Sequence, residues 1–281
     1  MRPKRPLMRY YGGKWRIAPW IVSHFPPHRI YVEAFGGGAS VLLQKEPAYG
    51  EVYNDLDGEV VNVFRVIRKN SKRFKRIIDA MPFAREEMEI SYRRVKDPVE
   101  RARRTIIRSF MGYGSDSVTR ECRTGFRSNS NRSGTTPAHD WASWPKQIQA
   151  FHLRLKGVVV ENRDACEVMA SQDSEETLHY LDPPYIHDTR STLQTKHGYR
   201  FEMSDSDHGR LRDFVRTLKG MVLISGYEHK IYNELGWEKK ELQTLTFSNG
   251  NKGSPRTEVL WMNPSCIRNQ SQMKLFSEGA S

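Results

Sequence analysis

The chain has 281 residues, of which 37% are hydrophobic, and this length suffices for one large domain with a smaller one inserted or appended. No apolar run approaches the roughly 18 residues of a membrane span, the N-terminus lacks a signal-peptide pattern, and three cysteines without CxxC spacing favour neither a disulfide framework nor a zinc site. We therefore expect a soluble protein in the cytoplasm of a prokaryotic or phage-infected cell.

The first third of the sequence alternates between strand and helix patterns. Helical spacing of apolar residues begins after Gly58, and short β-rich runs precede it. The expected elements are, in order, a strand at 29–33, a glycine turn at 36–38, a helix beginning at 40–45, a strand at 50–55 and a helix from residue 58. This order is typical of a parallel α/β sheet.

The pattern changes between residues 71 and 150. Amphipathic basic helices lead into a Gly/Ser/Asn/Arg-rich stretch at 119–137, which predicts a helical insertion ending in a mobile loop. Residues 65–132 hold 19 Lys and Arg against 8 Asp and Glu, so this quarter carries +11 of the net charge of +12. Single runs fit solvated helix faces, but a whole basic segment favours a nucleic-acid partner.

Strand and helix patterns then resume. The expected elements are strands at 157–161 and 178–182, a helix at 206–219, a strand at 221–226 and an antiparallel pair at 241–247 and 257–262. The chain thus predicts one α/β domain from residues 1–70 and 151–281, interrupted by a helical domain at 71–150.

Glycines and acids follow the first strands. The cluster Gly36 to Gly38 permits positive φ and close backbone approach, so an adenosyl or dinucleotide ligand can contact main chain there, although such turns also occur without a ligand. Asp55 ends the next strand, where an acid typically holds ribose hydroxyls or caps a helix. Asp164, after the strand at 157–161, leaves the corresponding alternatives of a ligand contact or a helix cap.

The strand at 178–182 ends in Asp182, followed by Pro183, Pro184 and Tyr185. An acid there lies at the carboxyl edge of the sheet, where open α/β proteins bind ligands. The prolines cannot continue the ladder and hold the chain extended. A carboxylate beside a carbonyl accepts two hydrogen bonds from an amino group, and the tyrosine offers a face for stacking. The segment predicts a clamp for an exocyclic amine on an aromatic base, whereas DPP alone would fit a simple turn.

These motifs resemble those of the Dam-like adenine-specific DNA methyltransferases across nearly the whole chain. YYGGK (10–14) looks like the N-terminal cofactor motif, EAFGGGAS (33–40) like the glycine motif, NDLDGEVVNVF (54–64) like the ribose-acid segment and LDPPY (181–185) like the catalytic motif. The order of the motifs matches as well.

Two departures from the family pattern stand out. Members commonly read F-x-G-x-G, whereas Ala39 takes the last place here; alanine is small, so we expect cofactor binding to survive. After Tyr113 and Gly114, which resemble an aromatic-glycine element of the recognition domain, residues 115–127 do not follow the family. The resemblance therefore implies the cofactor and the chemistry but not the target sequence.

The resemblance implies a Rossmann-like S-adenosylmethionine-dependent methyltransferase sheet with an inserted helical target-recognition domain at 71–150. It implies methyl transfer from S-adenosylmethionine to the N6 amine of an adenine that leaves the duplex, without a metal or a covalent intermediate. The implied catalytic residues are Asp182, Pro183, Pro184 and Tyr185. The implied cofactor-binding residues are Tyr10, Tyr11, Lys14, Glu33, Ala34, Phe35, Gly36, Gly37, Gly38, Ala39, Ser40, Asp55, Leu56, Arg163, Asp164 and Asp182.

Other reactions remain open at this point. The same clamp would serve the N4 amine of cytosine, an RNA adenine or a protein glutamine, and a catalytically silent DNA-binding protein would keep the fold. Asp before PPY favours adenine by resemblance, and the basic insertion argues against glutamine. Methylation of a cytosine ring carbon needs a cysteine nucleophile, and no cysteine here lies in a Pro-Cys corner.

The implied partner is double-stranded DNA, bound by a monomer or weak dimer. Arg120, Arg123 and Arg127 lie in a Gly/Ser-flanked stretch and are predicted to enter a groove, since arginine commonly reads guanine. Tyr113, in the aromatic-glycine element, is a fourth candidate contact.

Two further segments carry predictions. Lys72 lies between Arg68 and Arg76 on one helix face, which predicts contacts to phosphates. Residues 187–201 form a polar stretch of about 15 residues after the catalytic corner, which predicts a lid that is mobile without DNA.

Overall fold

The structure is a computed structural model that describes residues 2–114, 117–119, 123–129, 134–189, 198–246 and 254–278, without the side chains of 245, 246, 254 and 272–278. Its strands are β1 (Ile30–Glu33), β2 (Gly50–Asn54), β3 (Val158–Glu161), β4 (Thr177–Leu181), β5 (Met221–Tyr227), β6 (Glu238–Thr246) and β7 (Ser254–Met262). Its helices are α1 (Ala18–Ser23), α2 (Gly58–Asp79), α3 (Arg85–Ser91), α4 (Pro98–Met111), α5 (Pro137–Ser143), α6 (Ile148–Leu155), α7 (Ala165–Gln172), α8 (Asp205–Val215), α9 (Lys230–Asn233) and α10 (Pro264–Glu278), with 3-10 turns η1 (Trp144–Gln147) and η2 (His187–Thr189).

The strands form one sheet in the order β3-β2-β1-β4-β5-β7-β6. The first five in this order are parallel to one another, and β7 pairs antiparallel with both β5 and β6. The chain moves outward from β1 through β2 to β3 and then returns to the other side of β1 with β4. In open α/β sheets such a reversal opens a crevice at the carboxyl ends of the two central strands, so β1 and β4 fix where a ligand can bind.

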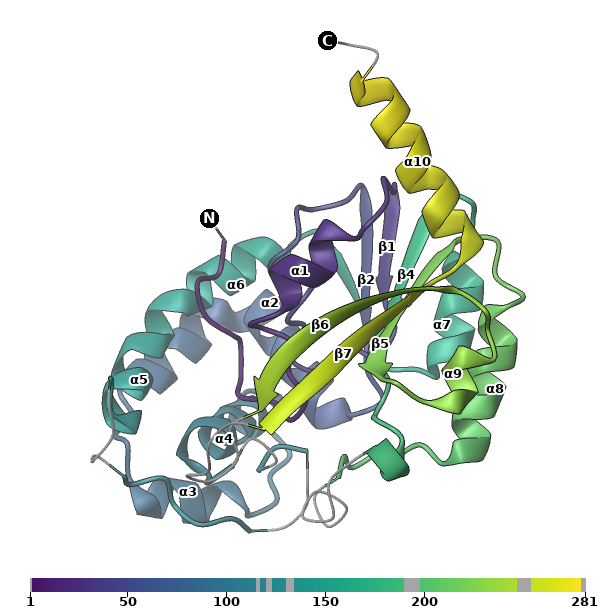
Figure 1. Cartoon of the computed structure of the whole chain (residues 1–281). Coiled ribbons are helices and arrows are strands. Elements are labelled where there is room, and N and C mark those ends of the chain that lie inside the picture. Colours follow the sequence, from purple (N-terminus) through teal and green to yellow (C-terminus); the bar gives the residue numbers. More distant parts are fainter. Residues whose placement is uncertain are drawn as a thin grey trace.

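Apolar cores cover both faces of the sheet. Successive residues of a strand point to opposite faces: Tyr31 joins the core under α1, α2, α4 and α6, and Val32 joins the core under α7, α8 and α9. Figure 1 shows α7, α8 and α9 on one side of the sheet and α1, α2 and α6 on the other. Within the described residues, no helix is long and apolar enough to cross a bilayer.

The helical segment between β2 and β3 packs into the first of these cores. The long helix α2 bends at Asn70, whose φ of −130° is not helical, and α3, α4 and α5 follow beyond the bend. Phe110 of α4 contacts Trp144, which in turn contacts Phe151 of α6. These rings belong to the same buried cluster as Tyr31, so the segment is continuous with the core on one face of the sheet.

The prediction of a helix beginning at 40–45 is wrong. The segment forms consecutive turns, although Leu43 and Lys45 donate backbone hydrogen bonds to Ala39 and Val41. The amide of Leu42 donates instead to the carboxylate of Glu33 at 2.8 Å. Glu33 therefore satisfies an amide near the start of the segment, and the chain leaves the turns at residue 46 before a regular helix extends.

Candidate active site

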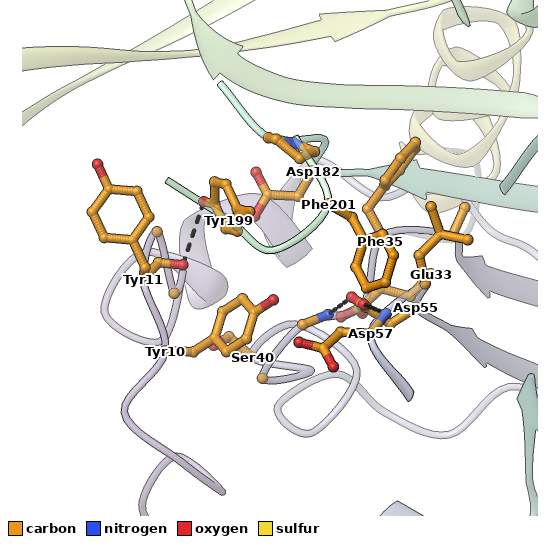
Figure 2. A pocket seen from close by; sticks show the side chains of 18 of the residues that line it. Tyr10, Tyr11, Glu33, Phe35, Ser40, Asp55, Asp57, Asp182, Tyr199 and Phe201 are labelled. Carbon is orange, nitrogen blue, oxygen red and sulfur yellow. Dashed lines mark hydrogen bonds between the residues drawn. The ribbon is translucent and has the colours of Figure 1, made fainter. Parts of the chain in front are cut away.

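A cleft opens at the carboxyl ends of β1 and β4. Glu33 and Tyr180 are register partners on these strands, so the glycine turn after β1 and Asp182 after β4 face the same space. Figure 2 shows aromatic rings and carboxylates from segments far apart in the sequence, among them Tyr10, Asp55 and Asp182, around this cleft. Its lining comprises Tyr10 to Lys14, Glu33 to Gly38, Ser40, Val41, Asp55 to Asp57, Ala165, Tyr180, Asp182, Pro184 and Tyr199 to Met203.

The glycine turn packs directly on Tyr10. Gly37 has φ +46°, and a Cβ added to it would lie 2.6 Å from Cε1 of Tyr10. Its carbonyl accepts a hydrogen bond from the Tyr53 hydroxyl at 2.8 Å, and its amide donates to Asp55 at 2.8 Å. Ala39, where the resembling family has glycine, also has a positive φ, +51°. The turn therefore keeps a left-handed backbone although alanine stands in the last place.

We expect Gly37→Ala to weaken both the fold and cofactor binding. The left-handed conformation costs a residue with a side chain roughly 1–2 kcal/mol, and the added methyl group must also displace the Tyr10 ring. Thermal unfolding and titration with S-adenosylmethionine measure the two effects. Gly157→Ala is the control, because a Cβ there meets no atom within 4 Å; equal behaviour of the two variants would contradict the tight packing of the turn.

Asp55 faces the cleft and does not cap α2. Its two oxygens accept from the amides of Gly37 at 2.8 Å and Asp57 at 2.7 Å. The N-cap of α2 is Asp57, which accepts from Glu59 N at 2.9 Å. Burial raises the pKa of Asp55 to about 6. Each carboxylate oxygen has a second lone pair, so Asp55 retains capacity for donors that enter the cleft, and Leu56 beside it is exposed.

Glu33 is a buried carboxyl at the end of β1. One of its oxygens accepts from the Tyr31 hydroxyl at 2.6 Å and from Leu42 N at 2.8 Å. Burial is the main cause that raises its pKa to about 8. The residue therefore both shapes the turn and presents a carboxyl group to the cleft.

Asp182 is joined to a buried lysine. The ammonium of Lys14, only 5% exposed, lies 2.7 Å and 2.9 Å from the two Asp182 oxygens and also donates to the carbonyl of Gly12 at 3.1 Å. The hydroxyl of Ser225, on β5, donates to Asp182 at 3.0 Å. Burial raises the pKa of the Asp182 carboxyl, against the lowering effect of Lys14. The carboxylate is thus fixed in orientation from two sides.

Tyr185 and Glu258 complete this cluster. Glu258, on β7, is 4% exposed; it accepts a hydrogen bond from the Tyr185 hydroxyl at 2.7 Å and lies 3.6 Å from the Lys14 ammonium. That ammonium also lies 4.6 Å from the centre of the Tyr185 ring, and the ring of Tyr227 packs 4.4 Å away at 55°. Glu258 was not predicted from the sequence.

Comparison with known proteins decides the family. Residues 10–245 match the family described as D12 class N6 adenine-specific DNA methyltransferase. The chain belongs to this family. The methyltransferase is also 24% identical over 285 residues to the Type II methyltransferase M1.LlaDCHI of Lactococcus lactis subsp. cremoris. The alignment covers 91% of this chain and 93% of that protein.

Family membership answers the question of the reaction. The protein is an N6 adenine-specific DNA methyltransferase, its substrate is DNA and its methyl donor is S-adenosylmethionine. The α/β fold with a Rossmann-like sheet is confirmed as well. Cytosine N4, RNA adenine and a silent DNA-binding protein are accordingly set aside.

Three predicted cofactor residues of the methyltransferase lie outside the cleft lining: Ala39, which is buried in the glycine turn, Arg163 and Asp164. Asp164 is exposed and caps α7, accepting from the amides of Cys166 at 2.9 Å and Glu167 at 3.2 Å. The guanidinium of Arg163 is directed to Glu167 at 3.1 Å. Ala165, the next residue, takes the place in the lining that the sequence assigned to its neighbours.

The last residues of the predicted lid, Tyr199 to Phe201, line the cleft of the methyltransferase. Arg200 donates to Asp57 at 2.6 Å, and the Tyr199 ring lies 5.3 Å from that of Tyr11. Phe201 lies over the cleft beside them (Figure 2). Residues 190–197 of the predicted lid lie outside the described residues, so its mobility stays a prediction, and His187 at its start is exposed.

The predicted recognition residues have different environments. Tyr113 is 53% exposed, and Arg123 is exposed with its guanidinium 5.7 Å from the centre of the Tyr92 ring. Arg127 is half-buried, pairs its backbone with Met111 and lies 3.9 Å from Asp140. An exposed arm therefore describes Arg123 but not Arg127, and Arg120 lies outside the described residues.

A basic groove adjoins the cleft and was not predicted residue by residue. It is lined by Glu59, Tyr92, Arg93, Arg94, Val95, Lys96, Arg101, Arg104, Arg108 and Arg200. Arg200 belongs to the lining of both hollows. Arg101 pairs with Glu59 and Arg104 with Glu100, whereas Arg93, Arg94 and Lys96 make no ion pair with any described residue. These three cations are available to an anionic partner.

Lys72 has a different place. Arg68, one turn before it on α2, donates to the carbonyl of Val158 at 2.6 Å. Val158 begins β3, so Arg68 lies at the amino edge of the sheet, and Lys72 lies further along α2, away from the cleft. The predicted phosphate contact of Lys72 therefore has less support than contacts made by the basic groove.

Proposed function

We propose that the cleft between β1 and β4 holds S-adenosylmethionine beside a flipped adenine, and that Asp182, Pro183 and Tyr185 bind the adenine. The observation that carries this proposal is the position of Asp182 at the reversal of strand order, opposite the glycine turn. The family supplies the reaction; the assignment of roles to residues is ours.

The lining fits the parts of S-adenosylmethionine. Asp55 accepts the ribose hydroxyls, since it follows β2 and already receives the amide of the glycine turn. Backbone at Gly36 to Gly38 allows close approach of the cofactor. Tyr10 and Phe35 offer aromatic faces for the adenine ring of S-adenosylmethionine. The carboxyl group of Glu33 accepts a hydrogen bond from the amino group of the methionine part. Arg163 and Asp164 have no role here, because neither lines the cleft.

Asp182 and the carbonyl of Pro183 each accept one hydrogen of the adenine N6 amine. This arrangement directs the nitrogen lone pair away from the ring plane and toward the methyl donor, while Tyr185 stacks on the base. S-adenosylmethionine, when bound, supplies the methyl group on its sulfonium. As the nitrogen forms its new bond to carbon, it acquires positive charge, which the nearby Asp182 carboxylate stabilises. The nitrogen then releases one proton, and Asp182, whose pKa burial raises, accepts it.

We expect the affinity for S-adenosylmethionine to rise between pH 5 and pH 7.5. Because burial raises the pKa of Asp55 to about 6, the carboxyl is mostly protonated at the lower pH and ionised at the higher, and the ionised form is the better acceptor for ribose hydroxyls. With about one tenth of the residue ionised at pH 5, the effect reaches about tenfold. In the free protein the same raised pKa lowers stability as pH rises from the ordinary value of 3.8 to about 6.

Calorimetric titrations across this range measure the change in affinity. The Asp55→Asn variant is the control, since it cannot ionise, and Glu33 contributes equally to both proteins. A wild-type affinity that changes with pH no more than that of Asp55→Asn would remove Asp55 from the ribose site.

The basic groove beside the cleft binds the phosphate backbone of the duplex. Arg93, Arg94 and Lys96 lie along it without internal ion pairs in the described chain, and Arg200 connects it to the cleft. Phosphate contacts position a protein on DNA without reading sequence. Arg123, exposed near Tyr92, is the described residue best placed to read bases.

A labelled-methyl transfer assay on unmethylated duplex DNA tests the proposal. We expect label in N6-methyladenine, and sequencing of modified bases then defines the target site. Single-stranded DNA and RNA of equal sequence serve as competing substrates. Label in cytosine or preferential labelling of RNA would contradict the proposal.

A further inference from the structure

The amine site of this methyltransferase already holds an ammonium group. The predicted clamp offers the target amine a carboxylate at Asp182 and a flat ring at Tyr185. In the DNA-free protein, Nζ of Lys14 lies 2.7 Å and 2.9 Å from the carboxylate oxygens and 4.6 Å from the centre of that ring. An adenine amine that is to use Asp182 must therefore displace Lys14.

A second carboxylate lies where a displaced ammonium can go. Oε1 of Glu258 is 3.6 Å from Nζ of Lys14, about 0.8 Å longer than a charge-assisted hydrogen bond. The lysine stem is flexible, so a small rotation closes this gap. Glu258 itself is fixed, because its backbone pairs with Tyr227 on β5 and Leu242 on β6.

The charge of Glu258 is more than a hydrogen bond to Tyr185 requires. The Tyr185 hydroxyl donates to Oε1 at 2.7 Å, and a neutral glutamine would accept that bond equally well. Instead the protein places two carboxylates, the half-buried Asp182 and the buried Glu258, around the single ammonium of Lys14. A buried carboxylate is costly unless it is paired, so a second one in this cluster needs an explanation.

We propose that Lys14 occupies the target-amine site in the DNA-free protein and that Glu258 is the positioning residue that receives the Lys14 ammonium when the adenine amine binds Asp182. The proposal rests on the function proposed above. Without Glu258, the entering base would leave a buried ammonium with its nearest counter-charge lost. This proposal assigns Lys14 to the site of the target base, whereas the sequence had placed it in the cofactor site.

The Glu258→Gln and Glu258→Asp variants separate charge from hydrogen bonding. Glutamine keeps the shape and the acceptor oxygen but loses the charge, whereas aspartate keeps the charge on a shorter stem. We expect Glu258→Gln to lose at least about tenfold in kcat/KM for DNA and Glu258→Asp to lose less. If Tyr185 alone needs Glu258, the order is reversed, and that result would overturn the inference.

Base flipping gives a second readout. Once sequencing has defined the target site, a duplex with 2-aminopurine at the target adenine reports unstacking by its fluorescence. We expect a weaker fluorescence rise with Glu258→Gln than with wild type, and recovery when Lys14→Met is added, because no ammonium then competes for Asp182. A double variant that flips the base no better than Glu258→Gln would contradict the displacement of Lys14.

Matched controls keep this test distinct from the proposed function. Glu241→Gln makes the same change of charge at an exposed position on β6 and is expected to match wild type. The Kd for S-adenosylmethionine should stay within about twofold in all Glu258 variants, well under the 1.4 kcal/mol of a tenfold change. Failure of wild type to methylate any DNA refutes the proposed function, whereas active wild type with glutamine equal to or better than aspartate at 258 refutes only the role of Glu258.

Discussion

Asp182→Ala is expected to reduce methyl transfer by at least about 10²-fold to 10³-fold, the range found when one preorganised group is removed from a transition state. The alanine removes the acceptor that orients the N6 amine and the negative charge that faces the developing cation. It also leaves the Lys14 ammonium with Glu258 as its remaining carboxylate partner in the described cluster. Single-turnover measurements with labelled S-adenosylmethionine isolate this chemical step.

Cofactor affinity should change much less in this variant. Asp182 faces the amine, while the ribose and methionine parts are assigned to Asp55 and Glu33, so the Kd should rise by no more than about tenfold, or 1.4 kcal/mol. Asp182→Asn should fall between alanine and wild type, because the amide keeps one acceptor oxygen without the charge. Near-wild-type turnover of Asp182→Ala would sink the proposed mechanism.

A matched acid at the same edge of the sheet serves as the control. Asp164 ends the loop after β3 and caps α7 through the amides of Cys166 and Glu167. Its replacement by alanine should cost about 1 kcal/mol of stability, as for other N-caps, and leave transfer unchanged. The two aspartates thus separate loss of chemistry from loss of a helix cap.

The parallel half of the fold follows closely from local patterns. The strands ending at Glu33, Asn54 and Leu181 are short runs rich in β-branched and aromatic or other apolar residues, and each lies within one residue of its expected bounds. Because chemistry in such sheets gathers where strands end, the same runs located Asp55 and Asp182. The local sequence pattern therefore predicted both the strand and the acid at its carboxyl end.

Tertiary contacts account for what the sequence could not provide. Asp55 and Asp57 are both acids near the start of α2, and only the structure shows that Asp57 caps the helix while Asp55 receives the amide of Gly37. Glu258 lies in an antiparallel strand expected from sequence, yet its nearness to Lys14 depends on that strand pairing beside β5. No spacing between residues 14 and 258 encodes this contact.

Counting charges in the sequence likewise identified the basic segment but not which part of its surface is available to DNA. The excess in residues 65–132 lies in α2, α4 and the loops, because α3 itself is net negative, and several of the cations are held in internal ion pairs. Arg103, for example, binds both Glu87 and Glu100. Arg93, Arg94 and Lys96 make no ion pair with a described residue and line a groove beside the cleft, whereas the other such cations of α2, among them Lys72, lie elsewhere on that helix. The predicted position at Lys72, by contrast, lies on a helix that leads away from the cleft.

Replacing Arg93 and Arg94 together by alanine is expected to weaken DNA binding on every sequence. Each cation that neutralises a phosphate releases a counterion, so the slope of log affinity against log salt should become shallower by about 0.9 per lost contact, or about 1.8 for the pair. Lys72→Ala combined with Arg76→Ala removes the same charge from α2 and should leave the slope nearly unchanged. Salt titrations with a fluorescent duplex measure both.

Target choice should respond differently from affinity. Because phosphate contacts carry no sequence information, methylation profiles over a randomised duplex library should keep the same preferred site in the Arg93→Ala, Arg94→Ala variant. Arg123→Ala, which removes an exposed guanidinium beside Tyr92, should instead relax one position of the site by about 1–3 kcal/mol. If the α2 variant alters the salt slope as much as the groove variant, the duplex lies along α2, and the groove beside Arg200 is a solvated basic surface.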